Sequence, residues 1–122
     1  MPVSGIDASY YTTKDLTRST AFYADMIGSP PTFHVPDMVS EWTFAGGESF
    51  GLYHDKDGTS FSPSGGVMFA VPDVADARAT LTGKGVRFHG DIEETPGCHM
   101  AFGVDPDGNG FILHKRKGGE ST

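Results

Sequence analysis

The second half of the chain repeats the first half, and this repeat restricts the fold more than any other sequence feature. An offset of 58 residues places Asp15 on Asp73, and each aspartate separates a β-branched or aromatic stretch from a helical pattern. A unit of this kind leaves one sheet face uncovered, so the copies must cover each other or a partner chain. We therefore expect one domain over residues 1–122, built from module one (1–58) and module two (63–117).

Module one has the pattern of one helix and four short strands. Asp15 has the side chain of a helix N-cap, and the pairs Phe22/Met26 and Tyr23/Ile27 lie on one helical face. The helix is expected to end at Gly28. Strands rich in β-branched and aromatic residues are expected at 8–13, 32–35, 41–45 and 49–54.

Module two follows the same order. Asp73 is expected to cap a helix whose apolar residues Val74, Ala77 and Leu81 share a face. The segment 105–109 has the composition of a tight turn, because Pro fixes φ while Gly and Asn accept positive φ. Strands are expected at 67–71, 86–89, 98–104 and 110–115. The fold class is therefore α+β, with two tandem βαβββ modules that curl into half-barrels facing each other across a central cavity.

Charge and composition exclude several classes of partner. The net charge of -7 disfavours nucleic acid, because a negative surface repels phosphate backbones. Cys98 is the only cysteine, so no intrachain disulfide forms and a reducing compartment is expected. No apolar run is long enough to cross a membrane, and the N-terminus has no basic region. We expect a cytoplasmic protein with neither nucleic acid nor membrane as a partner.

Two motifs resemble those of the vicinal oxygen chelate superfamily. They are Lys-Asp-Leu-Thr-Arg-Ser-Thr-Ala-Phe-Tyr over 14–23 and Asp-Pro-Asp-Gly-Asn over 105–109, each in its place within two matched halves. The resemblance covers about residues 6 to 115. The superfamily includes glyoxalase I, extradiol dioxygenases, fosfomycin-resistance enzymes and bleomycin-resistance proteins, so the fold alone does not imply one chemistry.

The resemblance implies a metal held by His, Glu or Gln on the first and last strands of each half. In this sequence the four corresponding positions are Ala8, Gly51, Gly66 and Ile112, none of which offers a lone pair to a cation. We therefore expect no metal and no cofactor. The resemblance then favours the bleomycin-resistance type, acidic proteins that sequester a cationic aromatic drug between two subunits, and hence a homodimer with a small-molecule ligand.

Strand alternation extends these family positions to the side chains that line the cavity. By that extension, and by family analogy for Phe102, the ligand-binding residues are expected to be mainly aromatic and apolar: Tyr10, Trp42, Tyr53, Met68, Met100, Phe102, Ile112 and His114. Small residues at Ala8, Gly51 and Gly66 favour open space there. The same apolar side chains would also suit a filled core.

Three functions are consistent with the sequence. The first is metal-independent binding of an aromatic or cationic compound. The second is an enzyme, either a glyoxalase-like lyase or isomerase or a dioxygenase, with an atypical site for which Cys98 and His114 are the available pair. The third is a dimerisation or regulatory module without a small-molecule role. No residue is assigned a catalytic role.

Overall fold

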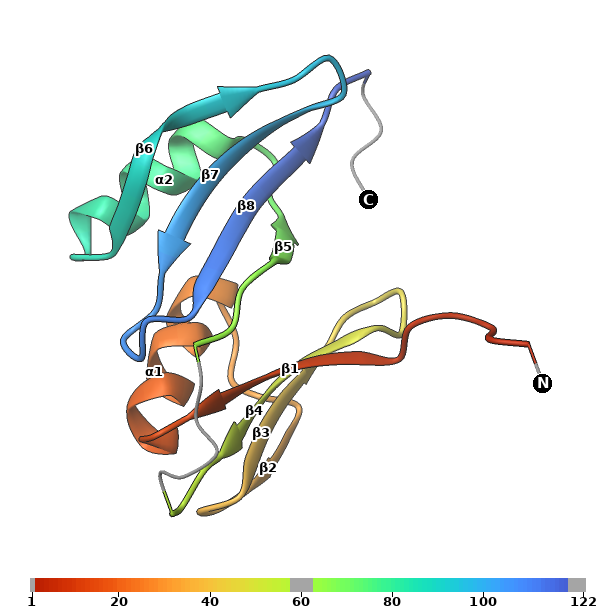
Figure 1. Ribbon diagram of the computed structural model, residues 1–122, viewed down its shortest axis with the longest axis vertical. Coiled ribbons are helices and arrows are strands. Elements are labelled where there is room, and N and C mark those ends of the chain that lie inside the picture. The colour runs from red at the N-terminus through yellow and green to blue at the C-terminus, as the bar shows by residue number, and fades with distance from the viewer. Residues whose placement is uncertain (1, 58–62, 119–122) are drawn as a thin grey trace. The chain divides into compact units, whose positions relative to one another are not determined.

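The computed structural model describes residues 2–57 and 63–118, and the chain divides into two compact units, Met1–Pro63 and Ser64–Thr122. Residues 1 and 58, the ends of predicted module one, lie outside the described residues. Each unit is one βαβββ module, so the chain is α+β as expected (Figure 1). The first contains β1 (Ala8–Thr13), α1 (Leu16–Ile27), β2 (Phe33–Val35), β3 (Val39–Thr43) and β4 (Ser49–His54). The second contains β5 (Val67–Ala70), α2 (Val74–Gly83), β6 (Arg87–Glu94), β7 (Cys98–Val104) and β8 (Gly110–Arg116).

Both modules build the same four-stranded sheet. The strand order is β1-β4-β3-β2 in the first and β5-β8-β7-β6 in the second. The first strand of each module runs parallel to the last, and all other neighbours are antiparallel. A parallel pair needs a long crossover connection, which the helix and the two intervening strands provide.

The helices begin at the two aspartates that the repeat aligned. The Asp15 side chain accepts a hydrogen bond from the Arg18 backbone N–H at 3.0 Å, and Asp73 accepts one from that of Asp76 at 2.9 Å. Each aspartate thereby satisfies a donor that has no partner inside the helix. Helix α1 ends at Gly28, where φ is 93° and the backbone N–H donates to the Ala24 carbonyl. Both N-caps and this end agree with the prediction.

The core of the first module lies between α1 and one face of its sheet. Tyr23 of α1 is fully buried, and its ring centroid lies 4.8 Å from that of Phe50 and 6.5 Å from that of Trp42. The Trp42 indole N–H donates to the Ser29 carbonyl at 2.9 Å. Aromatic packing with a satisfied indole fixes the helix on this face of the sheet.

The core of the second module lies between α2 and its own sheet, with Phe111, Leu113 and Ala101 all buried. The turn before β8 is held by buried polar groups. Asp105 accepts hydrogen bonds from the backbone and the side-chain amide of Asn109, and the Asn109 side-chain oxygen accepts one from the Ser64 backbone N–H at 2.7 Å. The predicted turn therefore also binds the backbone at the start of the second module, at Ser64.

Strands β2, β5 and β8 differ from their predicted bounds by one residue, and β3 and β6 differ by more. Strand β3 begins at Val39, because the tight turn at Pro36 and Asp37 closes directly onto it with a hydrogen bond from Met38 N–H to the Val35 carbonyl. Strand β6 continues to Glu94, because a shift of register between His89 and Glu93 lets its pairing with β7 resume after an irregular segment. Within the described ranges, neither helix has the length and apolar character needed to cross a membrane.

Candidate functional site

Each sheet has one face against its own helix and one face directed away from it, which we call the open face. In the first module, cross-strand registers align Tyr10, Gly51, Glu41 and Phe33 in one row across the open face. Their sequence neighbours Tyr11, Phe50 and Trp42 alternate to the helix side and are buried. The open face of the first sheet is thus the face on which β1, β4, β3 and β2 carry the side chains that do not pack against α1.

A Tyr–Glu pair spans this row. The Tyr10 hydroxyl donates a hydrogen bond to Glu41 Oε1, although the two residues belong to β1 and β3 with β4 between them. Gly51 of β4 makes this reach geometrically feasible, because a Cβ there would lie 2.5 Å from Tyr10 Cε2 and 2.6 Å from Cζ. The phenol ring of Tyr10 therefore lies across Gly51, and its hydrogen bond to Glu41 depends on the absence of a side chain at residue 51.

The environment of Tyr10 holds its proton on the phenol. Partial burial of the ring, the hydrogen bond to Glu41 and the negative charge of that carboxylate, in this order, raise the pKa of Tyr10 to about 12. Tyr10 is consequently a hydrogen-bond donor throughout the neutral range. A phenol that donates to a carboxylate has a more electron-rich oxygen, so the pair is a good acceptor for cationic groups.

Exposed aromatic rings share the open face with Glu41. The exposed fractions are 43% for Tyr10, 53% for Tyr53 and 54% for Phe33, although large aromatic side chains usually bury themselves. The only charged side chain among the strand positions of this open face is that of Glu41. A surface that combines aromatic faces with one carboxylate suits an aromatic ligand that carries a positive charge.

The other predicted ligand-binding residues lie in the second module. On the open face of its sheet, Met68, Ile112 and Phe102 form one row and His114 and Met100 stand opposite each other in the next. Their neighbours Phe111, Leu113 and Ala101 alternate to the helix side and are buried. Strand alternation therefore placed these five residues on a common face, and their role in ligand binding stays a prediction.

The predicted placement of Trp42 among the ligand-binding residues is wrong. Its side chain is 1% exposed and lies on the helix side of the first sheet, packed against Tyr23 and Phe50. The residue of β3 on the open face beside Trp42 is Glu41, which was not among the predicted ligand-binding residues. A signal was present, because burial of an unpaired carboxylate is costly and Glu41 should therefore have been assigned to the open face.

The first sheet does not fit the metal that the family resemblance implies. The two positions on this sheet are Ala8 and Gly51, and the space beside Gly51 is taken by the Tyr10 ring. On the second sheet Ile112 is hydrocarbon, and Gly66 has a φ of 95° just before β5. Within residues 2–57 and 63–118, no group of three or more His, Cys, Asp or Glu side chains is arranged to hold a metal ion.

The second candidate pair, Cys98 and His114, also lies on the open face of the second sheet. Cys98 stands opposite Arg116 and His114 stands opposite Met100, so the two are diagonal neighbours on adjacent strands. The nearest polar partner of the Cys98 sulfur is Thr95 Oγ1, at 3.2 Å. Among the polar contacts of these described residues, the thiol does not donate to an imidazole base, the hydrogen bond that nucleophilic catalysis requires.

Comparison with known proteins agrees with this architecture. The sequence model described as Glyoxalase/Bleomycin resistance protein/Dioxygenase superfamily matches residues 5–113. A search of curated proteins found no match to the sequence.

Solved structures with the same fold have diverse names. A lactoylglutathione lyase from Agrobacterium tumefaciens is 16% identical with a TM-score of 0.77, over 93% of this chain and 95% of that one. A superfamily member from Sphaerobacter thermophilus DSM 20745 is 24% identical with a TM-score of 0.73, over 92% and 97%. Oxidase ChaP-H1 is 18% identical with a TM-score of 0.74, over 97% and 100%. At these identities the likeness extends to the fold and not to the reaction.

Proposed function

Because the chain belongs to the glyoxalase, bleomycin resistance protein and dioxygenase superfamily, we propose that it binds a small aromatic cation without the help of a metal. The observation that carries this proposal is the Tyr10 ring lying across Gly51 and donating to Glu41. The Tyr10 ring thus fills the space at Gly51, one of the positions where the family resemblance implies a metal ligand. An aromatic ring and a carboxylate are both groups that attract organic cations.

The recognition rests on two contributions. The exposed rings of Tyr10, Tyr53 and Phe33 offer stacking surfaces and cation–π contacts, each contributing about 0.5–1 kcal/mol at exposed sites. Glu41 adds an attraction of about 1 kcal/mol for a partly exposed charge pair. The net charge of -7 raises the local concentration of cations at the surface and so accelerates their association.

A pair of probes of nearly equal shape tests the proposal. Benzyltrimethylammonium carries a charge, and neopentylbenzene is its neutral carbon analogue, so the difference in Kd isolates the contribution of the charge. We expect NMR titration to show shifts at Tyr10 and Tyr53 and tighter binding of the ammonium compound. Glu41→Gln should weaken that binding about fivefold, equivalent to about 1 kcal/mol, and leave the neutral analogue unaffected.

The control variant is Glu48→Gln, which removes an equal charge from the turn between β3 and β4 and not from the open face. It should leave the Kd of benzyltrimethylammonium unchanged, as should treatment with EDTA. Equal binding of the charged and neutral probes, or binding that appears only after a divalent metal is added, would contradict the proposal.

A further inference from the structure

The open face of the second sheet carries three side chains with soft donor atoms close together. Cys98 and Met100 are two residues apart on β7 and point to the same face, and His114 of β8 is the cross-strand partner of Met100. We call Cys98, Met100 and His114 the soft-donor cluster. It offers a thiol, a thioether and an imidazole, and the proposed function on the first sheet uses none of them.

The hydrogen-bond pattern between β7 and β8 sets the spacing of the cluster. The Lys117 backbone N–H donates to the Gly97 carbonyl at 2.8 Å, so residues 97 and 117 form a hydrogen-bonded pair. Pairs alternate along an antiparallel ladder, which makes Met100 and His114 a non-hydrogen-bonded pair with Cα atoms about 4.5 Å apart and close side chains. Cys98 is diagonal to His114, with a Cβ separation of about 7–8 Å.

These spacings allow one ion to contact all three side chains. Each side chain extends beyond its Cβ, and bonds from metal to sulfur or nitrogen are about 2.0–2.3 Å long. Two donors whose Cβ atoms are about 7–8 Å apart therefore meet at an ion placed between them. All three side chains are partly exposed, so an ion can enter from solvent.

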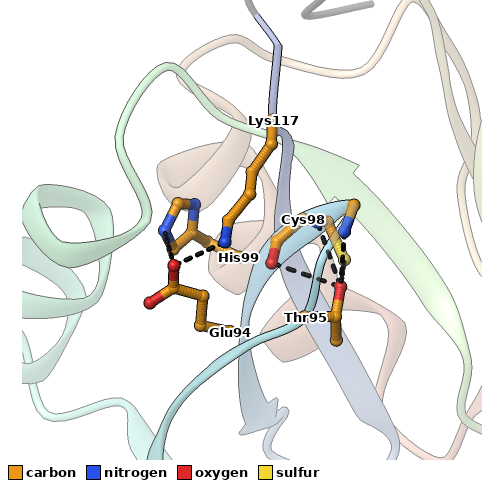
Figure 2. Close-up of polar contacts among 6 residues, drawn as sticks. Glu94, Thr95, Cys98, His99 and Lys117 are labelled. Carbon is orange, nitrogen blue, oxygen red and sulfur yellow. Dashed lines mark hydrogen bonds and ion pairs between the residues drawn. The ribbon is translucent and has the colours of Figure 1, made fainter.

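Thr95 contacts the Cys98 sulfur and orients it (Figure 2). Its hydroxyl oxygen accepts hydrogen bonds from the backbone N–H of Gly97 at 3.1 Å and of Cys98 at 3.0 Å. Both lone pairs are then used, so the hydroxyl proton is left to donate to the Cys98 sulfur at 3.2 Å or to the Cys98 carbonyl at 3.4 Å. A donor directed at a sulfur fixes the orientation of that sulfur as a ligand.

We propose that the soft-donor cluster binds Cu(I). Thiolate and thioether sulfur favour this soft ion, and imidazole also binds copper. When the ion binds, the Cys98 thiol releases its proton to solvent, a copper–sulfur bond forms, and no electron is transferred. The thiolate neutralises the charge of the ion. Arg116 opposite Cys98 and Glu93 opposite Met100 add one charge of each sign beside the cluster.

Anaerobic titration of the reduced chain with Cu(I), in competition with bicinchoninate, tests this site. We expect one Cu(I) per chain, loss of binding in Cys98→Ser, and at least a tenfold weaker affinity in both Met100→Leu and His114→Gln. Met38→Leu, which changes an exposed methionine on the loop before β3, should leave the affinity unchanged. Far-UV circular dichroism confirms that each variant is folded.

Zinc provides the second readout. A thioether is a poor ligand for Zn(II), so Met100→Leu should leave any Zn(II) affinity unchanged while it weakens Cu(I) binding. Failure of the wild-type chain to compete with bicinchoninate for Cu(I) would overturn the proposal. So would equal Cu(I) affinities of wild type, Met100→Leu and His114→Gln, because the cysteine would then bind the ion without the other two.

Discussion

Replacing Gly51 with alanine tests the central feature of the first module. The new Cβ would lie 2.5 Å from Tyr10 Cε2, 2.6 Å from Cζ and 3.0 Å from Cδ2, whereas ordinary contacts are 3.4–4 Å. The methyl group meets three atoms of one ring, and side chains occupy discrete rotamers. We therefore expect the Tyr10 side chain to move to another χ1 rotamer, away from β4, and to lose its hydrogen bond to Glu41.

The pKa of Tyr10 measures this movement. It is about 12 in the folded chain, so release of the ring into solvent should lower it toward the ordinary value of a tyrosine, near 10. Two pKa units correspond to a change of about 100-fold in the acidity of the phenol. NMR titration of the chain labelled with ¹³C at tyrosine Cζ follows each tyrosine separately across the alkaline range.

Glu41→Gln is the matched comparison. It removes the carboxylate but leaves the ring on Gly51, and partial burial is the largest cause of the raised pKa. Its effect on the pKa of Tyr10 should therefore be smaller than that of Gly51→Ala. If Gly51→Ala leaves the pKa near 12, or lowers it less than Glu41→Gln does, the ring does not depend on the glycine and the reasoning is refuted.

Two further predictions concern the second module. Asn109→Ala should lower the free energy of unfolding by about 1–3 kcal/mol in urea denaturation, because the part-buried Ser64 N–H loses its acceptor and Asp105 Oδ2 loses the donor on the Asn109 side chain. A loss below about 0.5 kcal/mol, as at ordinary surface sites, would contradict this prediction. The hydrogen bond from Lys117, its charge and the nearby His99 lower the pKa of Glu94. The stability that ionised Glu94 contributes to the folded chain is present above the ordinary glutamate pKa. It is lost as the pH falls through the lowered pKa of Glu94. Lys117→Gln should therefore raise the pKa of Glu94, measured by carboxyl NMR, and an unchanged value would show that the 2.5 Å contact is not formed in solution (Figure 2).

Local sequence patterns were sufficient for most of the elements. Strands β1, β4 and β7 have the predicted bounds, because each combines β-branched or aromatic residues with flanking turn residues. Both helices begin after the aspartates that the repeat aligned, since an N-cap is a local interaction within one turn. The irregular strand β6 was predicted too short, because its continuation depends on pairing with β7 and not on its own composition.

The sequence alone determined the repeat, the superfamily, and the absence of lone-pair donors at Ala8, Gly51, Gly66 and Ile112. These properties depend on residue identity and spacing along the chain. Only the tertiary structure decided which residues are neighbours across strands, because hydrogen-bond register joins positions that are distant in sequence. It turned Trp42 to the core and Glu41 to the open face, and it placed Gly51 beneath the ring of Tyr10. From the sequence, Gly51 is only a position that lacks a metal ligand. In the structure, the absence of a side chain at Gly51 leaves the space that the Tyr10 ring fills.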